Sequence, residues 1–174
     1  ALNYWLAEPS DSVELYITDA SGDTLRTLKH KGKKGINRVW WDLKGDPTTQ
    51  ILMRTKPQYA DWVALGKDRP RKPPLVPFSV LVPPGTYTVH LNLTDQKHSI
   101  EVKKDPHSEG SMADITAQTD LMQKLYTDMN AVAAKINSIE KMRRQCLDLE
   151  ATLAQSSKHK HFVEKVHRKG QGSR

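Results

Sequence analysis

The apolar residues of this chain change their spacing once, near residue 105. Before that point they alternate in steps of two between turn residues, and after residue 111 they recur in steps of three and four. Alternation by two is typical of half-buried β-strands, whereas steps of three and four place side chains on one face of an α-helix. The sequence therefore predicts a β domain over residues 1–106, a helical extension over residues 111–169 and a disordered tail over residues 170–174.

Six or seven short segments carry the alternating pattern of strands. Residues 13–18 alternate strictly, and the turn over residues 19–22 leads into a short return strand over residues 24–28. The basic, glycine-rich residues 29–35 are expected to form an exposed loop. The other segments with this pattern are residues 2–6, 36–43, 78–82, 87–93 and 99–102. Short strands joined by close turns favour an antiparallel β-sandwich.

Aromatic residues are the expected core of this β domain. Val39 and Trp41 share one face of a strand, while Trp40 and Asp42 lie on the other. We expect Trp41 to fill the space between two sheets, and Tyr87 to help hold them together.

A long irregular stretch from Gly45 to Pro77 interrupts the strands and contains six of the ten prolines. Proline has no backbone N–H to donate and is rare in inner strands. We therefore expect an extended insertion without a sheet, anchored by burial of Tyr59, Trp62 and Leu65.

The helical half begins with a capping-box pattern, Ser111 followed by Asp114. Because no proline or glycine occurs from Met112 to Lys169, we expect a helix of about forty residues, about 60 Å long. A small β domain cannot cover that length, so its apolar side must pack against a returning helix near Phe162, a second copy or another part of the parent protein. The expected pairing residues are Leu125, Met129, Val132, Ile136 and Ile139.

No set of residues has the spacing of a catalytic or metal site. Cys146 is the only cysteine, which excludes an internal disulfide, and burial in mid-helix would leave it inert. His159, His161 and His167 lie among basic residues whose charge opposes a metal ion. The aspartates are scattered and form no acid/base pair. We therefore predict no enzyme activity, no metal and no cofactor.

The net charge of +7 favours acidic partners such as nucleic acid. Acidic residues are interleaved along the helix, however, whereas a helix that reads a DNA groove is uniformly basic, so nucleic acid is not the predicted partner. No run of about 18 apolar residues occurs, and no membrane span is expected. Binding of a polymer, glycan before nucleic acid, is the alternative function. Its candidate contacts are Lys33, Lys34, Trp40 and Trp62.

The order of several motifs carries a family resemblance. VELYITDASGDTLRTL is followed by a basic glycine loop, GINRVWWDLKG, VPPGTYTVHLNL and IEVKKDP. This order resembles the immunoglobulin-like domain of the flagellar-hook-capping (FlgD) type, in the version found at the C-terminal end of large bacterial proteins with sortilin-like or sialidase-like β-propellers. It covers about residues 2–106, and INSIEKMRRQCLDLEATL is similar to the helical tail of that family.

The resemblance implies an immunoglobulin-like β-sandwich followed by a helical hairpin or coiled coil. It implies a non-catalytic C-terminal module that braces its parent protein or mediates assembly, in the periplasm or outside the cell. Its partner would be its own upstream propeller or another protein, and a homodimer through the helices stays open. Propeller repeats and Asp-boxes do not occur in these residues, so the glycosyl hydrolase label of such proteins refers to another part.

Overall fold

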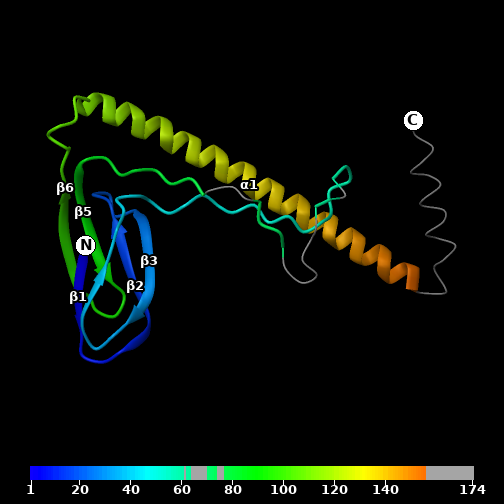
Figure 1. Cartoon of the computed structure of the whole chain (residues 1–174), viewed down its shortest axis with the longest axis horizontal. Helices are drawn as coiled ribbons and strands as arrows, with labels where there is room; N and C mark the ends of the chain where they lie inside the picture. Colours follow the sequence, from blue (N-terminus) through cyan, green and yellow to red (C-terminus); the bar gives the residue numbers. More distant parts are fainter. Residues whose placement is uncertain (61, 64–69, 74–76, 156–174) are drawn as a thin grey trace. The chain divides into compact units, whose positions relative to one another are not determined.

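The β + α composition expected from the sequence is present in the structure. The computed structural model describes residues 1–60, 62–63, 70–73 and 77–155. Within these residues the chain forms six β-strands followed by one long α-helix (Figure 1). The fold class is confirmed at this level, while the immunoglobulin-like sandwich and the coiled coil remain predictions.

The chain divides into two compact units, each built from two segments that are distant in sequence. Unit 1 consists of residues 1–48 and 77–129, and unit 2 consists of residues 49–76 and 130–174. The long helix, α1 (Met112–Gln155), contributes residues to both units. The units therefore cut across the change of apolar spacing near residue 105.

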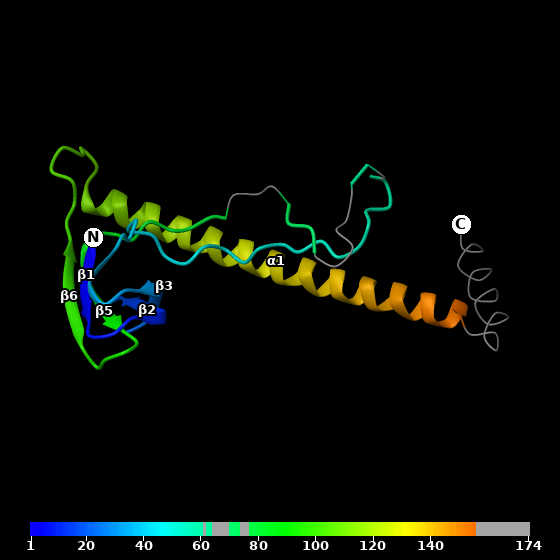
Figure 2. The same ribbon diagram turned by 60° about the horizontal axis from the view of Figure 1, so that its bottom comes forward.

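Unit 1 contains all the described strands. They are β1 (Leu2–Leu6), β2 (Ser10–Thr18), β3 (Thr24–Gly32), β4 (Gly35–Val39), β5 (Gly85–Leu91) and β6 (Lys97–Val102). β1 pairs with β4 in a two-stranded antiparallel sheet, and the other sheet has the antiparallel order β3-β2-β5-β6. Figure 2 shows the same strands turned by 60°.

Trp41 and Tyr87 lie in the core of unit 1, as expected. Their rings meet edge to face with centroids 5.7 Å apart. The Trp41 indole N–H donates to the Lys44 carbonyl at 2.9 Å, and the Tyr87 hydroxyl donates to the Pro83 carbonyl at 2.5 Å. Both aromatic side chains therefore bury their apolar surface without leaving a polar atom unpaired. The buried members of the core are Leu15, Ile17, Trp41, Val82, Tyr87 and Val89.

β3 is longer than the sequence predicted, because it continues through residues 29–32, which we expected to be a loop. The Lys29 Nζ lies 2.6 Å from a carboxylate oxygen of Glu14, and the Lys31 Nζ lies 3.1 Å from one of Asp11. Opposite charges on neighbouring strands stabilise a pair, so the basic residues are compatible with a strand once β2 lies beside them.

The predicted strand over residues 78–82 is wrong, although part of its backbone is paired. Its carbonyls accept from the N–H groups of Gly45 at 2.9 Å and Thr48 at 2.7 Å, and the Val82 N–H donates to the Leu43 carbonyl at 2.9 Å. Prolines flank this segment on both sides and cannot donate backbone hydrogen bonds. The segment therefore forms only an isolated bridge at residue 81.

The capping box at the start of α1 is confirmed. The Ser111 N–H donates to Asp114 Oδ2 at 2.9 Å, and the Asp114 N–H donates back to Ser111 Oγ at 3.2 Å. The Ser111 hydroxyl also donates to the carboxylate at 2.6 Å, and the bonds that the carboxylate accepts from the Ser111 hydroxyl and N–H lower the pKa of Asp114. Figures 1 and 2 show α1 as one uninterrupted helix. The continuation to residue 169, the returning helix and the predicted tail lie outside the described residues.

Candidate protein-interaction site

α1 has two lengthwise faces of different chemistry. One face is buried or half-buried and consists of Ile115, Thr119, Met122, Tyr126, Asn130, Ala133, Asn137 and Glu140. The second face is apolar and exposed, and it lies roughly a quarter turn away around the helix. Each face follows steps of three and four residues, so each forms a continuous row along α1.

In unit 2, asparagines of α1 bind the backbone of the proline-rich segment. The Thr49 N–H donates to Asn130 Oδ1 at 2.7 Å. Asn137 makes two such bonds: its Oδ1 accepts from the Leu52 N–H at 2.7 Å, and its Nδ2 donates to the Gln50 carbonyl at 3.0 Å. An extended segment outside a sheet needs partners for its backbone groups, and the helix side chains supply them here. The cyan trace of this segment follows α1 in both Figures 1 and 2.

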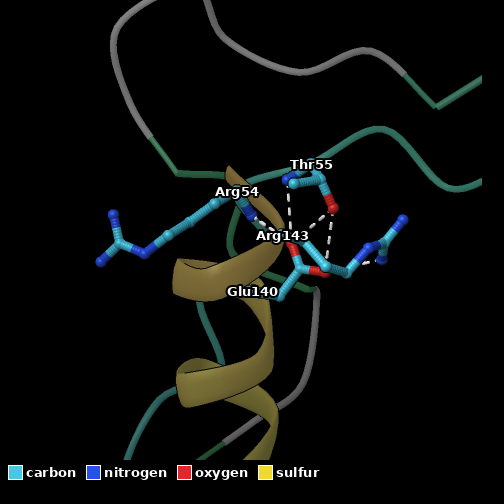
Figure 3. A network of polar contacts seen from close by, with 4 residues as sticks. All are labelled: Arg54, Thr55, Glu140 and Arg143. Carbon is cyan, nitrogen blue, oxygen red and sulfur yellow. Dashed lines mark hydrogen bonds and ion pairs between the residues drawn. The ribbon is translucent and has the colours of Figure 1, made fainter. Parts of the chain in front are cut away.

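Glu140 makes the deepest of these contacts and is only 3% exposed. Its Oε2 accepts from the Arg54 N–H at 2.6 Å and from the Thr55 N–H at 2.8 Å. The Thr55 hydroxyl donates to the same carboxylate at 3.0 Å, and Arg143 Nη1 lies 2.9 Å from Oε1. In Figure 3 the Arg54 side chain points away from Glu140, so Arg54 contributes through its backbone. We call Asn130, Asn137 and Glu140 the polar clamp.

The hydrogen-bond and charge partners of Glu140 stabilise its ionised form. Burial raises the pKa of a carboxyl group, because it disfavours the charged form. The backbone bonds from Arg54 and Thr55, the Thr55 hydroxyl and the positive charge of Arg143 outweigh burial, so the pKa of Glu140 lies below its ordinary value. The carboxylate is thus charged whenever the segment is docked at neutral pH.

We expect acid to weaken the docking of residues 49–55 on α1. Because the pKa of Glu140 is lower when docked than when free, its stabilisation is complete above the ordinary glutamate pKa and is lost as the pH falls through the lowered value. The Thr55 amide resonance, followed by NMR during acid titration, should shift with Glu140. Glu140→Gln should remove this titration step, and a Thr55 resonance that titrates equally in both proteins would contradict the assignment.

The polar clamp was not predicted from the sequence, because apolar spacing does not identify polar side chains that bind a neighbouring backbone. Asn130, Ala133, Asn137 and Glu140 follow steps of three, four and three. A row of amide, small and acidic side chains at helical spacing is the pattern that indicates backbone docking here.

Two of the three anchors predicted for the proline-rich segment, Tyr59 and Trp62, are wrong. Tyr59 is 86% exposed and Trp62 is 83% exposed, and Leu65 lies outside the described residues. Hydrogen bonds from α1 to the backbone hold residues 49–55, whereas the prediction relied on aromatic burial.

The second, apolar face of α1 contains every predicted pairing residue, and all of them except Ile136 are exposed. Val132 is 54% exposed and Ile139 is 51% exposed, while Ile136 is half-buried. We call this face the apolar stripe, and it consists of Leu121, Leu125, Met129, Val132, Ile136, Ile139 and Met142. Cys146 lies seven residues after Ile139 and is exposed, so its predicted burial is wrong.

The candidate polymer contacts are exposed but belong to different units. β4 ends at Val39, earlier than predicted, and Trp40 follows it with 73% of its surface exposed. Lys33 and Lys34 are exposed in the same unit, and Lys34 Nζ lies 3.0 Å from a Glu8 carboxylate oxygen. Trp62 belongs to unit 2.

Among the described residues, no three His, Cys, Asp or Glu side chains are grouped so that they could hold a metal ion. No helix in the described ranges has the length and apolar character needed to cross a membrane. The three histidines at 159, 161 and 167 lie outside those ranges.

Comparison with protein families, curated proteins and solved structures finds no match to this chain. The resemblance to the FlgD-type domain therefore stays a prediction.

Proposed function

We propose that the chain is a non-catalytic structural and protein-interaction module that binds a protein partner through the apolar stripe of α1. The observation that carries this proposal is the exposure of the stripe, with Val132 and Ile139 each about half exposed. Contiguous apolar surface of this kind marks interaction sites in soluble proteins. The polar clamp occupies a different face of α1, which leaves the stripe available.

The magnitude of apolar burial favours this interpretation. Fully burying one Leu, Ile, Val or Met side chain stabilises a protein by about 1.5–3 kcal/mol. A stripe side chain that is half exposed would therefore contribute about 1 kcal/mol when a partner covers its exposed half. Five such side chains would contribute on the order of 5 kcal/mol before the cost of association. That is enough for a specific contact only if the partner is apolar along its whole length.

The motif order over residues 2–106 supports a context for this module. As a FlgD-type domain, it would form the C-terminal part of a β-propeller protein in the periplasm or outside the cell, where it braces the propeller or joins it to another protein. Binding of a glycan or other polymer is the second candidate function. It is favoured by the exposure of Trp40, since an exposed indole ring offers a stacking surface.

Charged residues in the apolar stripe should release the chain from its assembly. We expect a tagged protein with Val132→Glu and Ile139→Glu to elute from an extract of its native cells at a smaller size than the unmodified chain. Both positions are exposed, so folding should be preserved, as circular dichroism would verify. The matched control is Thr127→Glu with Ser138→Glu, two exposed positions of α1 outside the stripe. Equal elution of all three proteins would contradict the proposed function.

A further inference from the structure

A regular row of exposed residues runs along α1 in alternating steps of four and three. Its members are Leu121, Leu125, Asp128, Val132, Lys135, Ile139, Met142, Cys146 and Leu149, and all nine are exposed. Alternation of four and three is the spacing of a two-helix coiled-coil interface. Two opposite charges, Asp128 and Lys135, interrupt the row near its centre. Neither forms an ion pair within the part of the chain that the structure describes.

We propose that the partner of the apolar stripe is a second copy of this chain, with the two α1 helices antiparallel and a two-fold axis near Val132. This inference rests on the proposed function and names the partner. A polar residue within such a row specifies register and orientation. The positions of Asp128 and Lys135, four residues before and three residues after Val132, make the row self-complementary in one orientation.

Charge selects the antiparallel arrangement. In a parallel pair in register, Asp128 would face the partner's Asp128 and Lys135 would face the partner's Lys135, and like charges across an interface are unfavourable. Rotation about an axis near Val132 instead brings Asp128 close to the partner's Lys135. Because a two-fold interface repeats each contact, two such pairs form.

The apolar residues match under the same rotation. Leu125 and Ile139 lie seven residues before and seven residues after Val132. The axis therefore places Leu125 against the partner's Ile139, Ile139 against the partner's Leu125, and the two valines against each other. Leu125, Val132 and Ile139 of the row therefore each meet an apolar residue of the partner, and Asp128 lies within one position of the partner's Lys135.

Oxidation of Cys146 distinguishes a parallel from an antiparallel pair of α1 helices. In a parallel pair in register the two thiols would face each other, and oxidation would join them. In the antiparallel pair each Cys146 lies fourteen residues from the axis, so the two are about 40 Å apart along the helices. A disulfide needs Cα atoms within about 7 Å. The native cysteine should therefore not cross-link the dimer.

Sedimentation equilibrium of the purified full chain tests this proposal. We expect the unmodified chain to dimerise, and Asp128→Lys or Lys135→Asp alone to raise the dissociation constant by about tenfold or more, because each change places like charges together. The double reversal, Asp128→Lys with Lys135→Asp, should restore association to within about threefold. Asp120→Lys, an exposed position of α1 outside the row, is the control for charge alone.

The outcomes separate this proposal from the proposed function. A chain that stays monomeric at all concentrations, while its assembly in cell extract still depends on Val132 and Ile139, would overturn the second copy and keep the interaction module. A dimer that ignores both charge reversals, or that oxidises readily through Cys146, would overturn the antiparallel arrangement. Assembly that depends on neither the stripe nor the row would overturn both proposals.

Discussion

Glu140→Ala is expected to release residues 49–55 from α1, at a cost of about 3 kcal/mol to their docking. The substitution leaves three donors without an acceptor: the N–H groups of Arg54 and Thr55 and the Thr55 hydroxyl. Thr55 is only 2% exposed, and an unpaired buried donor costs about 1–3 kcal/mol. Water that enters the vacated site can hydrogen-bond to these three donors, so the total cost is smaller than the sum of three separate penalties.

Amide hydrogen exchange measures this loss locally. If the docking of residues 49–55 is weakened by about 3 kcal/mol, the exchange rate of the Thr55 amide should increase by about a hundredfold. Glu150→Ala removes an exposed carboxylate from the same helix and should leave that rate unchanged. Equal exchange rates in the two variants would show that Glu140 does not hold the segment.

Gly32→Ala is expected to destabilise unit 1 by about 2–3 kcal/mol. A Cβ atom at this position would lie 2.4 Å from Leu6 Cδ1 and 2.8 Å from Val13 Cγ2. Both neighbours are buried in the core, and forcing an extra methyl group into a packed core costs about 1–3 kcal/mol. The short distances place this substitution near the upper end of that range.

Urea unfolding, followed by tryptophan fluorescence, tests the effect at Gly32. Gly110→Ala is the matched control, because a Cβ atom there meets only the Ser108 hydroxyl, at 3.8 Å. We expect a lower midpoint for the Gly32 variant and little change for the control. A Gly32 variant as stable as the unmodified chain would mean that Leu6 and Val13 can move away from β3 at no cost.

Local patterns predicted much of unit 1 and the start of α1. The predicted turn at residue 19 is present, since Asp19 Oδ1 accepts from the N–H groups of Ser21 at 2.9 Å and Asp23 at 3.0 Å. Each such feature depends on residues within four positions of one another, and the capping box at Ser111 is of the same kind. Alternation likewise placed Trp41 and Trp40 on opposite faces, and in the structure Trp41 is buried and Trp40 is exposed.

Features that depend on distant segments were missed. The extension of β3 requires Glu14 and Asp11 of β2 to offset Lys29 and Lys31, and a segment considered alone does not contain those partners. The polar clamp joins residues 85 or 86 positions apart through Glu140. The sequence therefore predicted the apolar face of the candidate site, while the polar face required the structure.

The central claim is that a partner covers the apolar stripe. It is tested most directly by photo-cross-linking in native cells, with a benzophenone amino acid introduced at Val132 in one protein and at Thr127, on an exposed part of α1 outside the stripe, in another. We expect one dominant adduct from position 132, with the mass of two chains, and almost none from position 127. Equal, weak cross-linking from both positions would contradict the account.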